Sequence, residues 1–156
     1  MKNIIIASTS TLHGGEYIDY LLPELQSFFS NVKELLFIPY ARPSGISHDD
    51  YTKKVSEAFD KINIAVKGIH EFENPIEALE KAQGIFTGGG NTFLLVSQLY
   101  KNDVIDTLEK VVKNGIPYLG TSAGRLSDGV QSQLEVAFYN FPSYQLSPVV
   151  HSCPSW

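Results

Sequence analysis

The residues best suited to chemistry lie in one short segment, Gly120-Thr121-Ser122-Ala123-Gly124. Ser122 stands between two glycines directly after an apolar run, which is typical of a nucleophile elbow, where a sharp turn lifts the serine hydroxyl clear of a sheet. Glycine has no Cβ, so the backbone can turn tightly at both flanks. The next amide, that of Ala123, would then be free to donate to an oxyanion. The pattern also arises by chance, and a plain tight turn is the alternative.

A second glycine-rich segment, Gly88-Gly89-Gly90-Asn91, allows three interpretations. It could bind a phosphate at a helix N-terminus, present backbone amides to an oxyanion, or form an ordinary strand-to-helix turn. It is not a P-loop, because no Lys-Ser/Thr pair follows, and the spacing of the dinucleotide fingerprint is absent. A candidate nucleophile on a neighbouring strand favours the oxyanion interpretation, with the amide of Gly89 or Gly90 as donor.

Short apolar runs alternate with amphipathic segments and predict the elements that must position these loops. Strands are expected at 3–7, 34–39, 62–69, 84–87 and 116–119, and helices at 14–29, 51–60, 75–82, 92–100 and 104–113. Asp49 or Asp50 is expected to cap the second helix, Asn74 the third, and Asn114-Gly115 to end the fifth. The alternation predicts an α/β fold with a mostly parallel, doubly wound sheet. Ligands bind beyond the carboxyl ends of such strands, where residues 8–11, the glycine segment and the elbow would meet.

Length and composition indicate a single domain and argue against several kinds of partner and site. A chain of 156 residues is most simply one domain, and its net charge of −5 argues against nucleic-acid or anionic-membrane partners. The single cysteine, Cys153, excludes an internal disulfide and a cysteine-rich zinc site, and no metal or cofactor is expected. The isoleucine run near the N-terminus is too short for a signal peptide or a membrane span, so we expect a cytoplasmic protein.

The two glycine segments, taken in order, resemble a known family. GIFTGGGNTFLLVSQLY followed by GIPYLGTSAG, together with STSTLHGGEYIDYLLPEL and LFIPYA, is similar to peptidase E, the aspartyl dipeptidase family, over residues 1–124. The resemblance implies a three-layer sandwich like that of class I glutamine amidotransferases. It implies a serine hydrolase that acts on Asp-X dipeptides without a metal. By position, Ser122 would be the nucleophile, and the amides of Gly89 or Gly90 and Ala123 would form the oxyanion hole.

The chain departs from the family pattern after residue 124. Val149 falls where the family has its catalytic histidine, and His151 lies two residues later, so His151 becomes the candidate base. Glu135 and Asp128 are the only carboxylates after the serine, and neither is tied to a histidine. We therefore expect residues 1–124 to form the peptidase-like domain, and residues 125–156 to be a divergent tail that belongs to the same domain or is poorly ordered.

Two functions remain open on this evidence. The first is a peptidase E-like dipeptidase, impaired by loss of the later triad members, and the second is an inactive remnant that acts as a binding or interaction module. Recognition of an aspartyl carboxylate suits a guanidinium, but Arg42 and Arg125 are both expected on the surface. A sheet that lacks its last strands would expose an edge and an apolar face, which a homodimer would cover.

Overall fold

The computed structural model describes residues 3–7 and 9–121. Its strands are β1 (Ile4–Ala7), β2 (Glu34–Ile38), β3 (Ala65–Gly68), β4 (Ile85–Thr87) and β5 (Tyr118–Thr121). Its α-helices are α1 (Leu22–Phe28), α2 (His48–Asp60), α3 (Pro75–Glu80), α4 (Thr92–Lys101) and α5 (Ile105–Lys113). Three short 3-10 turns, η1 (Asp19–Leu21), η2 (Pro43–Gly45) and η3 (Ile69–Glu71), complete the described elements.

The five strands form one sheet in the order β1-β5-β4-β2-β3, and every neighbouring pair is parallel. This confirms the predicted doubly wound parallel sheet. Because the strands are parallel, the ends of β5, β4 and β2 share one edge, and the glycine segment follows β4 there. Thr121, the last residue of β5, lies at the same edge.

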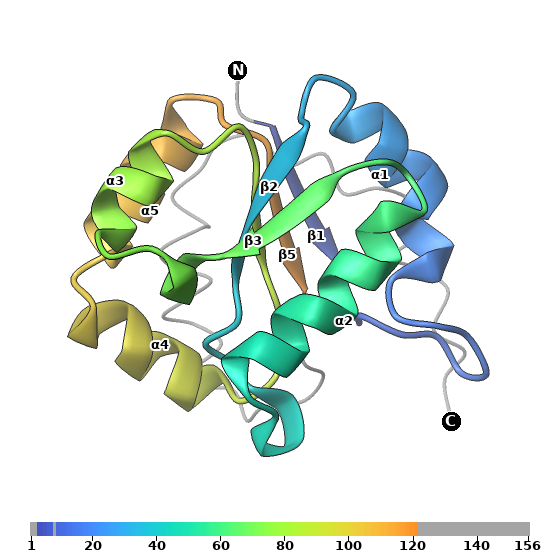
Figure 1. The fold of residues 1–156 in the computed structure, drawn as a ribbon, viewed down its shortest axis with the longest axis horizontal. Coiled ribbons are helices and arrows are strands. Elements are labelled where there is room, and N and C mark those ends of the chain that lie inside the picture. Colours follow the sequence, from blue (N-terminus) through green and yellow to red (C-terminus); the bar gives the residue numbers. More distant parts are fainter. Residues whose placement is uncertain (1–2, 8, 122–156) are drawn as a thin grey trace.

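Helices cover both faces of the sheet, as Figure 1 shows, with α1 and α2 on one side and α3, α4 and α5 on the other. The strand side chains alternate between two cores. In β2, Leu35 and Phe37 face the core under α1 and α2, while Leu36 and Ile38 face the other core. A strand buried on both faces explains why its sequence is apolar throughout.

The first predicted helix is shorter than expected. The apolar stripe of residues 14–29 is buried as predicted, but the α-helix begins only at Leu22, after the turn η1. Ile18 has a left-handed backbone, with φ of 49°, and its N–H donates to the Ser10 carbonyl at 2.6 Å. A β-branched residue in that conformation cannot continue a right-handed helix, which separates the predicted segment into two parts.

The second helix starts three residues earlier than predicted and has a different cap. The Ser47 hydroxyl accepts a hydrogen bond from the Asp50 N–H at 3.0 Å, so Ser47 is the N-cap. The predicted caps, Asp49 and Asp50, lie within the first turn, where their negative charges favour the helix dipole. The predicted cap of α3 is confirmed, because Asn74 accepts from the amides of Ile76 and Glu77.

Two strand boundaries also differ from the prediction. The third strand begins at Ala65 rather than 62, because the Ile62 and Ile64 amides still donate to the Phe59 carbonyl at the end of α2. The fifth strand covers Tyr118–Thr121 rather than 116–119. Pro117 has no N–H for the ladder, and the Ile116 amide donates back to Val111. This shift brings β5 up to the residue before Ser122.

The helices of the described part are all too short or too polar to cross a membrane.

Candidate active site

The backbone amides of the glycine segment are nearly all occupied. The Gly88 N–H donates to the Ile38 carbonyl, and the Asn91 N–H donates to the Ala41 carbonyl at 2.7 Å. The Gly89 N–H donates to the Thr121 hydroxyl at 2.8 Å. Within residues 3–7 and 9–121, the Gly90 N–H is the one amide of this segment with no hydrogen-bond partner.

Close backbone contacts explain why Gly90 has no side chain. A Cβ at this position would lie 2.6 Å from the Ala41 carbonyl oxygen and 2.9 Å from the Pro43 nitrogen. Its φ of 149° is also rarely adopted by residues with side chains. The loop after β2 thus packs directly against the glycine segment and fixes its path.

Thr121 joins the glycine segment to the end of β5. Its side chain is buried, and its hydroxyl accepts the Gly89 amide across neighbouring strands. Thr121, the residue before Ser122, therefore lies against the glycine segment at this edge of the sheet. Ser122, Ala123 and His151 themselves lie outside the described residues, so their predicted roles remain predictions.

Two buried tyrosines hold the glycine segment through a chain of hydrogen bonds. The Tyr51 hydroxyl donates to the Gly89 carbonyl at 2.8 Å, and the Tyr17 hydroxyl lies 3.2 Å from that of Tyr51. The Tyr51 ring leaves no room for a Cβ on Gly88 and packs edge-on against Phe37, with centroids 5.0 Å apart. The contacts of Tyr17 and Tyr51, and the bond from the Gly89 amide to Thr121, could not be predicted from the sequence, because the partners lie far apart in the chain.

Burial keeps these phenols neutral. Burial raises the pKa of Tyr51 to about 12, against a smaller lowering by the Tyr17 hydroxyl. Burial, followed by the neighbouring Tyr51, raises the pKa of Tyr17 well above its ordinary value, and the Thr121 hydroxyl acts in the opposite direction. Both hydroxyls therefore retain their protons for hydrogen bonding at neutral pH.

Alkaline pH is expected to unfold the protein through its buried tyrosines. Tyr51 and Tyr118 each have a pKa raised to about 12, whereas unfolded tyrosine titrates near 10. Between those values the unfolded state has lost protons that the folded state keeps, so the free energy of unfolding falls as pH rises. The slope is roughly 1 kcal/mol per pH unit for each tyrosine. Urea unfolding at several pH values from 9 to 11 measures it.

Tyr100→Phe provides the matched control for this prediction. Tyr100 is 64% exposed, so its removal should leave the pH dependence unchanged. Tyr51→Phe should make the dependence less steep. Stability that stays flat from pH 9 to 11 would contradict the prediction.

A pair of histidines lies near the same edge of the sheet. The rings of His48, at the start of α2, and His70, after β3, are 5.2 Å apart. His70 Nε2 lies 2.8 Å from the Asp49 carboxylate, whereas His48 Nε2 is buried without a partner among the described residues. Burial, then the neighbouring His70 and Arg42, lowers the pKa of His48, which favours its neutral form.

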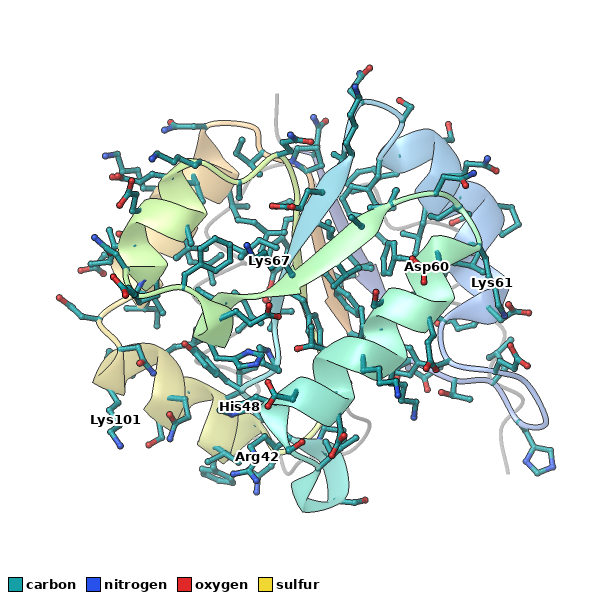
Figure 2. All side chains as sticks on the ribbon, in the orientation of Figure 1. Arg42, His48, Asp60, Lys61, Lys67 and Lys101 are labelled. Carbon is teal, nitrogen blue, oxygen red and sulfur yellow. The ribbon has the colours of Figure 1, made fainter. Side chains whose placement is uncertain are left out.

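The Arg42 side chain forms hydrogen bonds within its own loop. Figure 2 shows Arg42 and His48 at the same end of the molecule, near the start of α2. The Arg42 Nε donates to the Ile46 carbonyl at 2.9 Å, and one terminal nitrogen donates to the Gly45 carbonyl at 3.3 Å. These bonds brace the loop that packs on Gly90. The side chain is half-buried rather than fully on the surface.

A separate hollow lies at the opposite, amino-terminal edge of the sheet. Its lining includes Glu34, Phe72, Glu77 and Lys81, and it shares no residue with the glycine segment. In the described part of the chain, no three His, Cys, Asp or Glu side chains are grouped so that they could hold a metal ion.

Comparisons with known proteins point to one family. A family model described as peptidase family S51 matches residues 4–132. A peptidase E from Streptomyces coelicolor is 39% identical over 122 residues, covering 78% of this chain and 49% of that protein. A Drosophila melanogaster protein named "Probable alpha-aspartyl dipeptidase" is 40% identical over 126 residues, covering 79% of this chain and 51% of its own length.

A solved structure supports the same relationship. The crystal structure of a candidate peptidase E protein from Listeria monocytogenes EGD-e matches with a TM-score of 0.61 and 25% sequence identity. The match covers 80% of this chain and 60% of that one. The chain thus spans about half the length of the curated relatives it matches.

Proposed function

Because the chain belongs to peptidase family S51, we propose that it is a serine-type dipeptidase that hydrolyses Asp-X dipeptides, with Ser122 as nucleophile. The names of its relatives, peptidase E and alpha-aspartyl dipeptidase, supply the reaction and the substrate class. One observation on this chain supports the proposal. Among the described residues, the Gly90 N–H is the one amide of the glycine segment without a hydrogen-bond partner, and the segment is bonded to Thr121, the residue before Ser122.

The proposed reaction proceeds in two steps. The Ser122 oxygen attacks the carbonyl carbon of the aspartyl residue while its proton passes to the base, for which His151 is the candidate. The amides of Gly90 and Ala123 donate to the oxyanion that forms. The C–N bond then breaks, the amine leaves with the proton, and water hydrolyses the acyl-serine to release aspartate.

The geometry favours Gly90 over Gly89 as the donor from the glycine segment. The Gly89 N–H is already bonded to the Thr121 hydroxyl and would have to give up that bond to reach an oxyanion. Gly90 gives up no such bond within the described part of the chain. The developing charge would then be met by a donor that needs no rearrangement, which is the arrangement that makes an oxyanion hole effective.

The wider proposal follows from the same family membership. The partner is a small dipeptide rather than a nucleic acid or a membrane, and the reaction requires no metal or cofactor. The proposal places the enzyme in the cytoplasm and includes a homodimer as one way to cover exposed apolar surface.

A substrate panel tests the proposed function. The full chain is expected to release aspartate from Asp-Leu, and to leave Leu-Asp and Asn-Leu uncleaved, because the proposed site selects an N-terminal aspartyl side chain. Released amino acids are measured by chromatography. A serine-directed fluorophosphonate should add covalently to Ser122, which mass spectrometry of the digested protein locates. If Asp-Leu is not cleaved either, the result would favour the alternative that the protein is an inactive binding module.

A further inference from the structure

The two buried tyrosines form a directed chain of hydrogen bonds that ends on the glycine segment. Tyr51 has one hydroxyl proton, and it is donated to the Gly89 carbonyl. The 3.2 Å contact between the two hydroxyls therefore has Tyr17 as donor and Tyr51 as acceptor. The order is Tyr17 to Tyr51 to the Gly89 carbonyl.

This chain acts on the same peptide group that carries the Gly90 N–H. The peptide bond joins the Gly89 carbonyl to the Gly90 nitrogen, and no cis peptide occurs among the described residues. In a planar trans peptide the N–H points opposite to the C=O, so a bond that fixes the carbonyl also fixes the direction of the N–H. A hydrogen bond to the carbonyl also polarises the peptide and strengthens its N–H as a donor.

Packing alone does not account for the two hydroxyls. Tyr51 is 1% exposed and Tyr17 is 9% exposed, within an otherwise largely aliphatic and phenylalanine core. Burying a hydroxyl costs free energy unless it is hydrogen-bonded. Two phenylalanines would fill the same space without that cost, and Tyr51 would keep its edge-on contact with Phe37. The Tyr51 hydroxyl is thus explained by the Gly89 carbonyl that it binds, and the Tyr17 hydroxyl by its neighbours Tyr51 and Thr121, which both contact the glycine segment.

We infer that Tyr51, backed by Tyr17, is a positioning residue that holds the Gly89–Gly90 peptide so that the Gly90 N–H points at the oxyanion. This inference rests on the proposed function, in which the Gly90 amide is an oxyanion donor. Tyr51 does not touch the substrate in this arrangement. It acts through the Gly89–Gly90 peptide group, because it binds the carbonyl of that peptide while the N–H on the other side would face the substrate.

Kinetics of phenylalanine variants test the inference. Tyr51→Phe removes the hydroxyl and keeps the ring, and it is expected to lower kcat for Asp-Leu about tenfold with KM within about twofold. Tyr17→Phe, which leaves the bond to Gly89 in place, should lower kcat less. Tyr100→Phe is the matched control, because Tyr100 is 64% exposed near the end of α4 and lies outside the glycine segment. It should retain the wild-type kcat.

Amide NMR supplies a readout that needs no activity. In the 15N spectrum of the full chain, Tyr51→Phe should shift the Gly90 amide resonance and speed its hydrogen exchange, whereas Tyr100→Phe should not. A Gly90 amide unchanged in Tyr51→Phe overturns the inference, as does a lower melting temperature with unchanged kcat. If the wild-type chain cleaves no dipeptide, the proposed function fails. The NMR signal of the Gly90 amide in Tyr51→Phe then still tests whether Tyr51 positions that amide.

Discussion

Ser122→Ala is expected to lower kcat for Asp-Leu roughly a thousandfold or more. The substitution removes the oxygen that would form the acyl-enzyme, so only binding and oxyanion stabilisation would remain to assist attack by water. The affinity for the dipeptide should change little, because the serine hydroxyl contributes mainly to the transition state. Steady-state kinetics on the purified full chain, with kcat and KM determined separately, measure the effect.

Ser30→Ala is the matched control for this experiment. Ser30 is an exposed serine between α1 and β2, at the amino-terminal end of β2 and away from the glycine segment. It should keep the wild-type rate, and both variants should melt within a degree or two of the wild type. A Ser122→Ala protein that hydrolyses Asp-Leu at the wild-type rate would exclude Ser122 as the nucleophile.

Gly90→Ala is expected to cost both stability and activity. A Cβ there would lie 2.6 Å from the Ala41 carbonyl oxygen and 2.9 Å from the Pro43 nitrogen, and both are backbone atoms that cannot swing aside. The backbone φ of 149° adds strain for any residue with a side chain. Overpacking and backbone strain together predict a loss of roughly 2–5 kcal/mol in the free energy of unfolding. Urea denaturation measures that loss.

Gly14→Ala separates the two contributions. Gly14 also has a positive φ, of 77°, but a Cβ there would meet no atom within 4 Å. It should lose only the strain contribution, about 1 kcal/mol. The difference between the variants isolates the contact with the loop after β2. If Gly90→Ala were as stable as Gly14→Ala, the close packing of that loop on the glycine segment would be disproved.

The architecture was largely predictable because its signals are local. Apolar runs of β2 and β4 predicted buried strands, the stripe on residues 14–29 predicted a buried face, and Asn74 before Pro75 predicted a helix start. The predicted helix starts were wrong where a single residue determined the backbone conformation. Ile18 adopts a left-handed conformation that no propensity anticipates, and Ser47 caps α2 ahead of two equally plausible aspartates.

The site was predictable only in part, because its contacts are not local. The glycine segment was recognised from its composition, and the family resemblance is confirmed by the matches to peptidase family S51. The choice between Gly89 and Gly90 depends on the Thr121 hydroxyl, which lies on the neighbouring strand β5, 32 residues later in the chain than Gly89. The support from Tyr51 and Tyr17 depends on α2 and the segment before α1 packing together, which no spacing in the sequence reveals.

The position of β5 between β1 and β4 has a consequence for the order in which the protein folds. Ile4 pairs with Tyr118, so β1 reaches its described neighbour only through a contact that spans nearly the whole described chain. Closing so long a loop is entropically costly and slow. We therefore expect β1 to join the sheet late in folding. Thr121 belongs to β5, so the hydrogen bond between the Gly89 amide and the Thr121 hydroxyl also joins parts of the chain that are distant in sequence, and we expect it to form late as well.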